Sequence, residues 1–192
     1  LAEILIFGKR AGQHASERSL SLDVQFRSSQ VIQKAHEKID SFLKHGDHVA
    51  RPLQREIRNI MWQHCGVVRS EEKLAEGLQK IEHMKSFLDK LDVRPDSEGY
   101  EDLMLAFDLE AAIMSAEATI LGAQARKESR GAHQRSDFVS ISPEHECNYT
   151  VVLADDGKLT MGQEPLAELT DELRSLVDNT DEIEDFEGML LE

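Results

Sequence analysis

Only a few residues in this 192-residue sequence have types and spacings that could support chemistry. His45 and His48 lie three residues apart and flank Asp47, which gives a possible start of a metal site. A complete site needs further ligands, and this segment has the character of a loop that ends a helix. The sequence therefore favours a solvated loop over a metal centre at this position.

The other histidines and cysteines are weaker candidates for metal ligands. His145 and Cys147 are close in sequence, but a third ligand would have to come from the distant Cys65. His64 falls on an apolar helical stripe, where a hydrogen-bonded histidine of the core or its edge is more common than a ligand. Two isolated cysteines also argue against a disulfide scaffold or an iron–sulfur site. We predict no metal site in this sequence.

A basic segment offers a different kind of chemistry. Arg126, Lys127 and Arg130 are followed by Gly131 and His133 just beyond a long apolar helical pattern. Arginine binds carboxylates and phosphates through two parallel hydrogen bonds. By composition alone, however, the segment is better explained as a helix end, with Gly131 terminating the helix and the cations complementing its dipole.

Missing motifs, the net charge and the absence of long apolar runs argue against several classes of protein. The sequence contains no G-x-G-x-x-G motif, P-loop or G-x-S-x-G motif. A net charge of −15 argues against general binding to a nucleic-acid backbone. No apolar run is long enough to span a bilayer, and no charged-then-apolar leader marks a secretory signal. Because Leu1 already lies inside an apolar helical pattern, we expect the chain to be a piece of a larger protein.

The charge is concentrated near the C-terminus. Residues 140–192 contain 15 Asp or Glu residues but only two cations, Lys158 and Arg174. Such a segment is typical of a solvated tail, and it could also bind a basic partner. We favour the solvated tail.

The hydrophobic periodicity predicts a mainly α fold. It is an antiparallel three- to four-helix bundle with a small β-hairpin and an acidic C-terminal tail. Residues 1–12 are expected to form a helix in which Gly8 and Gly12 allow close packing, and residues 13–27 a connection. The other predicted elements are helices over 28–44 (stopped by Gly46), 52–64, 71–91 (capped by Ser70), 101–126 and 166–177, and strands over 149–153 and 158–161.

Three blocks of the sequence resemble one family. They resemble the C-terminal part of the flavoprotein subunits of succinate dehydrogenase and fumarate reductase, and they occur in the same order as in that family. The blocks are LAEILIFGKRAG (1–12), LQREIRNIMWQHCGVVRSEEKLAEGLQKIE (53–82) and SAEATILGAQARKESRGAHQRSDF (115–138). The resemblance covers residues 1–138, apart from looser stretches near 15–50 and 92–102. L-aspartate oxidase is a close relative of these subunits.

Individual positions separate the members of the family. Ala132 resembles succinate dehydrogenase and fumarate reductase, whereas Met61-Trp62 resembles L-aspartate oxidase, which remains the alternative. Val139 stands where the family usually has Pro, and the Asp/Glu-Asn-Trp block of the longer enzymes is absent. The segment after residue 138 is similar to that of cyanobacterial members.

The resemblance implies a domain organisation. Residues 1–20 would be the terminal helix of an FAD-binding domain, residues 28–138 a helical C-terminal bundle, and residues 139–192 the hairpin and acidic tail. The FAD-binding and capping domains, with the catalytic residues, would precede Leu1, so this fragment alone would be inactive. Leu1 matches a flavin-contacting leucine and is the one cofactor-binding residue that the resemblance implies here.

The resemblance also implies partners and a location. The full-length protein would bind FAD and a dicarboxylate, and would pass electrons to an iron–sulfur subunit. It would be cytoplasmic, or peripheral on the membrane through partner subunits, with neither nucleic-acid binding nor direct membrane insertion. We further hypothesise that Arg130 and His133 dock the bundle onto the flavin or capping domain. A stand-alone helical interaction module is the competing class.

Overall fold

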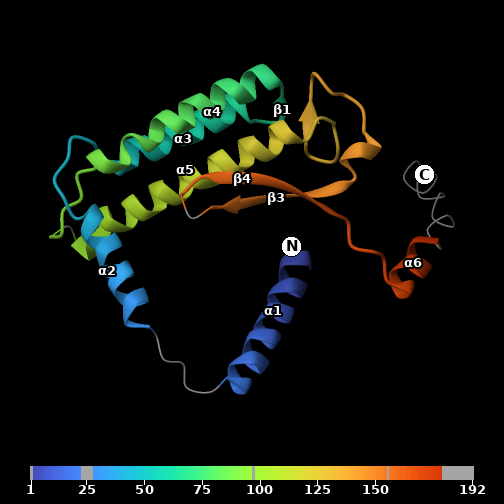
Figure 1. Cartoon of the computed structure of the whole chain (residues 1–192), viewed down its shortest axis with the longest axis horizontal. Helices are drawn as coiled ribbons and strands as arrows, with labels where there is room; N and C mark the ends of the chain where they lie inside the picture. Colours follow the sequence, from blue (N-terminus) through green and yellow to red (C-terminus); the bar gives the residue numbers. More distant parts are fainter. Residues whose placement is uncertain (1, 23–27, 97, 155, 179–192) are drawn as a thin grey trace, which may run out of the picture. The chain divides into compact units, whose positions relative to one another are not determined.

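The computed structural model describes residues 2–22, 28–96, 98–154 and 156–178 (Figure 1). The chain divides into two compact units, Leu1–Lys44 and His45–Glu192. The predicted fold class is confirmed, because helices dominate and a small antiparallel hairpin follows them. In the described part of the chain, no helix is both long enough and apolar enough to cross a membrane.

The first unit contains two helices, α1 (Ala2–Ser21) and α2 (Ser29–Phe42). The expected end of the first helix at residue 12 is wrong. Residues 13–21 contain neither Gly nor Pro, so nothing in them stops the helix. Within the first unit, apart from the helix's own backbone, no described atom lies within 4 Å of a Cβ built at Gly8 or Gly12, so this unit makes no close approach there.

The start of helix α2 was predicted correctly, but its end was not. The Ser28 side chain caps the N-terminus by accepting a hydrogen bond from the Gln30 backbone at 3.3 Å. The helix ends at Phe42, before Gly46, so Gly46 is not its stop signal. Within the second unit, a Cβ on Gly46 would lie 2.2 Å from the Lys90 carbonyl oxygen. The glycine is therefore required for close backbone contact, which continues in the bridge between His48 and Leu91.

The second unit is built on three helices that pack on one another: α3 (Ala50–His64), α4 (Glu71–Lys85) and α5 (Glu101–Ala125). Ser70 caps α4, as predicted, by accepting a hydrogen bond from the Lys73 backbone at 3.4 Å. The α-helix stops at Lys85 rather than near 91, and short 3₁₀ turns follow at Leu88–Lys90 and Glu98–Tyr100. Helix α5 is central and its buried residues are mostly small or aliphatic: Ala106, Leu109, Ile113, Ala116, Glu117, Ile120 and Ala123.

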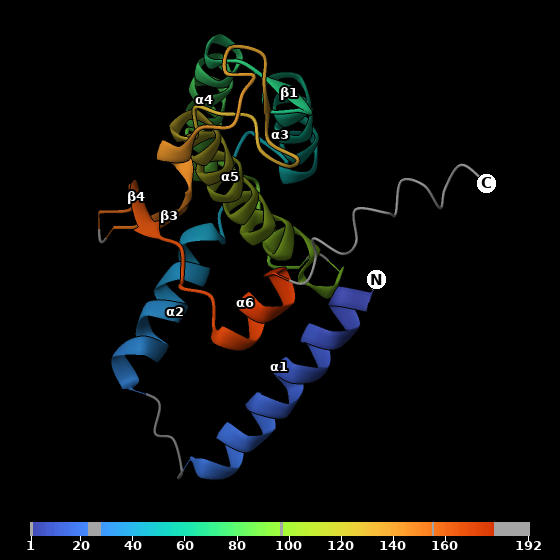
Figure 2. The ribbon, with the colours of Figure 1, turned by 90° about the vertical axis from the view of Figure 1, so that its right-hand side faces the viewer.

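The predicted hairpin is confirmed. Strands β3 (Cys147–Leu153) and β4 (Leu159–Pro165) pair antiparallel, with Leu153 opposite Leu159 and Gly157 in the turn at φ +79°. Figure 2 shows the hairpin and α3 on opposite sides of α5. A 3₁₀ turn, Pro143–His145, precedes the hairpin, and α6 (Asp171–Asp178) follows it, five residues later than the predicted helix start.

A second, very short sheet was not predicted. Strands β1 (Val68–Arg69) and β2 (Gln134–Arg135) pair in parallel, with Val68 opposite Gln134 and Arg69 opposite Arg135. This pairing holds the segment after α5 against the start of α4. The division of the sequence into domains at 1–20, 28–138 and 139–192 stays a prediction.

Candidate functional site

The basic segment 126–138 does not continue helix α5. The helix ends at Ala125, and its last turn contains no basic residue, so the interpretation of these cations as dipole partners is wrong. Instead the segment folds back in a tight turn. The backbones of Arg130 and His133 exchange hydrogen bonds of 2.8 and 3.0 Å, and Gly131 lies between them at φ +57°. Gly131 therefore serves this turn rather than the end of the helix.

A buried carboxylate lies at the centre of the segment. The side chain of Glu128 is fully buried and accepts hydrogen bonds from Arg130 Nε at 2.8 Å, from Arg130 Nη2 at 3.1 Å and from Arg126 Nη1. The backbone N–H of Ser142 donates a further bond at 2.9 Å. These bonds, that from Arg130 first, lower the pKa of Glu128 to about 2 although burial opposes them. Two of the cations predicted as a possible anion site thus bind an anion supplied by the chain itself.

Because Glu128 is ion-paired in the folded chain, its protonation at low pH should lower the stability of the fold. The pKa of Glu128 is about 2 in the folded chain against an ordinary 4.5, so the unfolded chain binds more protons between these values. The contribution of Glu128 to stability is therefore complete above about pH 4.5 and is lost as pH falls towards 2. We expect the urea midpoint of Glu128→Gln to fall less steeply over this range than that of the wild type. Parallel profiles would contradict the assignment.

A second buried charge ties α5 to α4. The Arg135 side chain is fully buried and donates to both carboxylate oxygens of Asp137, at 2.7 and 2.8 Å. It also reaches Glu71 at 3.1 Å and the Ala123 carbonyl at 2.8 Å. Asp137 in turn accepts the Glu71 backbone N–H at 2.8 Å, and its pKa is lowered chiefly by the Arg135 hydrogen bonds. The first turn of α4 and the last turn of α5 are joined through one guanidinium.

His133 is held by a bond on each ring nitrogen. Nε2 lies 3.0 Å from the Arg126 carbonyl oxygen, which can only accept, and Nδ1 lies 2.8 Å from Arg69 Nη1, which can only donate. The pattern requires the neutral ring with its proton on Nε2. Burial, aided by the nearby arginines, lowers the pKa of His133 and favours the same state. Both nitrogens of this docking candidate are therefore used within the chain.

Arg126 also anchors the hairpin. Its guanidinium donates to the carbonyl oxygens of His145 at 2.9 Å and Cys147 at 2.8 Å, at the start of β3. It lies 4.7 Å from the centre of the Tyr149 ring, in a cation–π contact. The Tyr149 hydroxyl is held by Gln163 on the opposite strand at 2.9 Å. Arg126 therefore connects the end of helix α5, Glu128 and strand β3, and Tyr149 in turn bonds strand β4.

The other candidates do not form a site. Among the described residues, no group of three or more His, Cys, Asp or Glu side chains is arranged to hold a metal ion. His45 pairs with Asp92 at 3.1 Å, and Cys65 and Cys147 are free thiols. His64 is a buried helix residue whose Nε2 accepts a hydrogen bond from Lys80 at 2.9 Å, as expected for a histidine of the core or its edge. Leu1, the predicted cofactor-binding residue, lies outside the described residues.

Sequence reasoning missed the carboxylates of this segment. Glu128 lies two residues from both Arg126 and Arg130, and Asp137 lies two residues from Arg135. In extended backbone, residues i and i+2 point to the same side. Opposite charges two residues apart, in a segment too polar for a core helix, were the sequence signal that could have predicted these ion pairs.

Comparison with solved structures shows the class of fold. The FrdA chain of Escherichia coli quinol fumarate reductase superposes with a TM-score of 0.78 at 23% identity, over 88% of this chain and 30% of that one. This chain therefore shares the fold of part of that FrdA chain.

Sequence comparison identifies the family. A family model described as fumarate reductase flavoprotein C-term matches residues 54–175, so the chain belongs to this family. A fumarate reductase (CoM/CoB) polypeptide of Methanothermobacter marburgensis is 30% identical, in a match that covers 75% of this chain and 26% of that protein. The succinate dehydrogenase flavoprotein subunit of Rickettsia bellii is 28% identical over 92% of this chain and 30% of that protein.

The matches extend beyond the resembling blocks, but they cover only part of the relatives. The family match extends beyond residue 138, where the resemblance seen in the sequence ends, and includes the hairpin. The chain spans less than a third of the relatives that it matches.

Proposed function

We propose that this chain contains the C-terminal helical domain of an FAD-dependent flavoprotein subunit that interconverts succinate and fumarate. The observation that carries this proposal is the family match over residues 54–175. Relatives named as fumarate reductase and succinate dehydrogenase flavoprotein subunits support the same substrate pair. The iron–sulfur partner subunit, and a cytoplasmic location or one peripheral to the membrane, belong to the same proposal.

The arginines after helix α5 do not fit a flavin diphosphate site. Arg126, Arg130 and Arg135 are already paired with Glu128 and Asp137. The proposal assigns FAD, the dicarboxylate and the catalytic step to the full-length protein. The role of the present domain is structural.

The proposal is tested with the full-length flavoprotein that contains this chain. We expect bound flavin, visible as absorbance in the blue, and turnover of succinate with an artificial electron acceptor or of fumarate with a reduced dye. Oxidation of L-aspartate without turnover of succinate or fumarate would instead select the L-aspartate oxidase alternative. If the full-length protein binds no flavin, the competing interpretation, a stand-alone helical interaction module, would be favoured.

The docking role of Arg130 and His133 is part of the proposal and needs a matched comparison. Because Arg130 binds Glu128, Arg130→Ala disturbs the bundle whether or not Arg130 touches another domain. Glu128→Gln weakens the same ion pair from its buried side and leaves Arg130 in place. If Arg130 docks, Arg130→Ala releases more FAD from the full-length protein than Glu128→Gln does at equal loss of Tm. Equal FAD loss in the two variants would show that Arg130 acts only as a partner of Glu128 within the bundle and does not dock another domain.

A further inference from the structure

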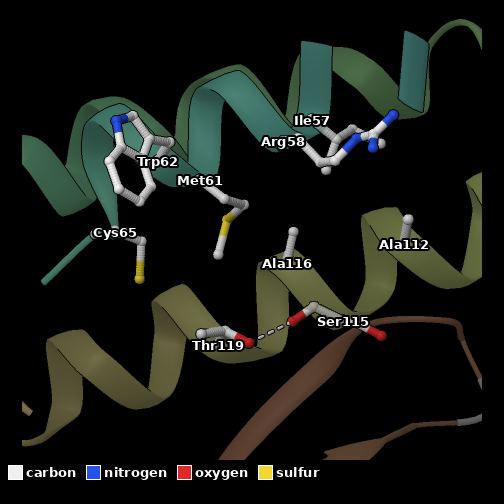
Figure 3. Close-up of a pocket in the computed structure, with 10 residues that line it drawn as sticks. Ile57, Arg58, Met61, Trp62, Cys65, Ala112, Ser115, Ala116 and Thr119 are labelled. Carbon is white, nitrogen blue, oxygen red and sulfur yellow. Dashed lines mark hydrogen bonds between the residues drawn. The ribbon is translucent and has the colours of Figure 1, made fainter. Parts of the chain in front are cut away.

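A groove lies between helices α3 and α5, and none of the ion-paired residues of segment 126–138 lines it. It encloses about 530 Å³ and is shown in Figure 3. From α3, Met61 and Trp62 form one wall, and from α5, Ala112 and Ala116 leave the floor shallow. The hydroxyl of Thr119 is satisfied within α5, since it donates to the Ser115 carbonyl at 2.7 Å. The surface offered by the groove is therefore mainly apolar.

The rim of the groove is aromatic and positively charged. Trp62 is 78% exposed, although it is the largest apolar side chain on α3. Arg55, Arg58 and Trp62 follow one another at i, i+3 and i+7, which places them along one face of the helix. Within the residues that the structure describes, neither Arg55 nor Arg58 forms an ion pair. Arg58 lines the groove, and Arg55 lies one turn away on the same face of α3. An apolar floor beside these cations suits an occupant with apolar and acidic side chains.

The chain itself contains a segment of this chemistry. Residues 179–192, NTDEIEDFEGMLLE, carry six carboxylates and no Lys or Arg. Large apolar residues alternate with the acids: Ile183, Phe186, Met189, Leu190 and Leu191. The segment follows α6 and lies beyond the family match, which ends at residue 175. Its charge and composition complement both the rim and the floor of the groove.

We propose that residues 179–192 dock in the α3–α5 groove of the same chain, with carboxylates paired to Arg55 and Arg58 and apolar side chains against Met61 and Trp62. The segment is long enough for the site: 14 extended residues span up to roughly 50 Å, whereas α3 is about 22 Å long. Because the segment belongs to the same chain, docking would be intramolecular, with an effective concentration set by the reach from Asp178 to the groove. The docked segment would exclude any other partner from this face.

Trp62 provides the test, because it is the only tryptophan in the sequence. We compare the 192-residue chain with a chain ending at Asp178, which keeps every described residue. Docking predicts that the full chain emits at shorter wavelength and is quenched less by acrylamide than the truncated chain. A synthetic peptide of residues 179–192 should restore the shift in the truncated chain, in a saturable and salt-sensitive manner.

Charge reversal shows where the peptide binds. Arg58→Glu should weaken peptide binding to the truncated chain by roughly fivefold or more, the size expected when an exposed ion pair becomes a repulsion. Lys73→Glu makes the same change of charge on the exposed surface of α4 and should leave binding unchanged. Circular dichroism confirms that each variant is folded.

Three outcomes would overturn the proposal. Identical Trp62 emission and quenching in the full and truncated chains, without peptide binding, would show that the segment does not use the groove. A shift that grows with protein concentration would assign the groove to the segment of a second copy. A Trp62 that is shielded in the full-length flavoprotein regardless of residues 179–192 would assign the groove to another domain.

Discussion

Arg135→Ala should destabilise this chain by about 3 kcal/mol, which corresponds to a fall in Tm of roughly 6–12 °C for a domain of this size. The substitution removes four hydrogen bonds from a guanidinium that is fully buried and orphans the buried Ala123 carbonyl. Losing one partner of a buried ion pair costs about 3–5 kcal/mol. We expect the lower end because Asp137 and Glu71, at 29% and 53% side-chain exposure, can regain water.

Thermal unfolding followed by circular dichroism measures this effect. Arg135→Lys keeps the charge but cannot form the two-pronged bond to Asp137, so its Tm should lie between those of the wild type and Arg135→Ala. Lys73→Ala, on the exposed face of α4, is the control and should change stability by no more than about 0.5 kcal/mol. An Arg135→Ala variant as stable as the control would show that the buried guanidinium does not hold the two helices together.

Gly77→Ala should destabilise the chain by up to about 2 kcal/mol, although alanine is the better helix former. A Cβ at Gly77 would lie 2.7 Å from the Cβ of His64, which sits next to the α3 backbone and cannot swing away. Helices α3 and α4 would have to separate, and overpacking of this kind costs about 1–3 kcal/mol. The gain of about 1 kcal/mol in helix propensity offsets only part of the cost.

Gly122→Ala is a control of opposite sign. Gly122 also lies in a helix, α5, but no described atom lies within 4 Å of a Cβ built there. Only the effect of helix propensity remains, so this substitution should stabilise the chain by up to about 1 kcal/mol. Urea unfolding of both variants distinguishes packing from propensity. If both substitutions shift the midpoint in the same direction, the close approach of α3 and α4 at Gly77 is not a constraint on stability.

The elements that local signals govern were predictable. Ser70 with the acidic turn after it marked the start of α4, and the apolar stripes of α5 indicated a central helix. The turn ending in Gly157 located the hairpin. These features depend on residues within a few positions of one another, so periodicity and turn chemistry are sufficient to find them.

The arrangement of the site could not be found in this way. Arg135 and Glu71 are 64 residues apart, and the two-residue pairing of β1 with β2 is too short to leave a periodic pattern. Local reasoning assigned Arg126 to the helix dipole. In the structure its side chain has stronger partners, the buried Glu128 and the carbonyls at the start of β3, and these become available only once the distant segments have come together.

The position of Arg126 has a consequence for how the chain comes apart. An isolated two-stranded hairpin is only marginally stable in water. Here the backbone of β3 is bound by a guanidinium whose other partner is sealed inside the turn after α5. Peeling the strands from the bundle would break the bonds from Arg126 to the carbonyls of His145 and Cys147, and its contact with the Tyr149 ring. We therefore expect the hairpin and the end of α5 to open to solvent together.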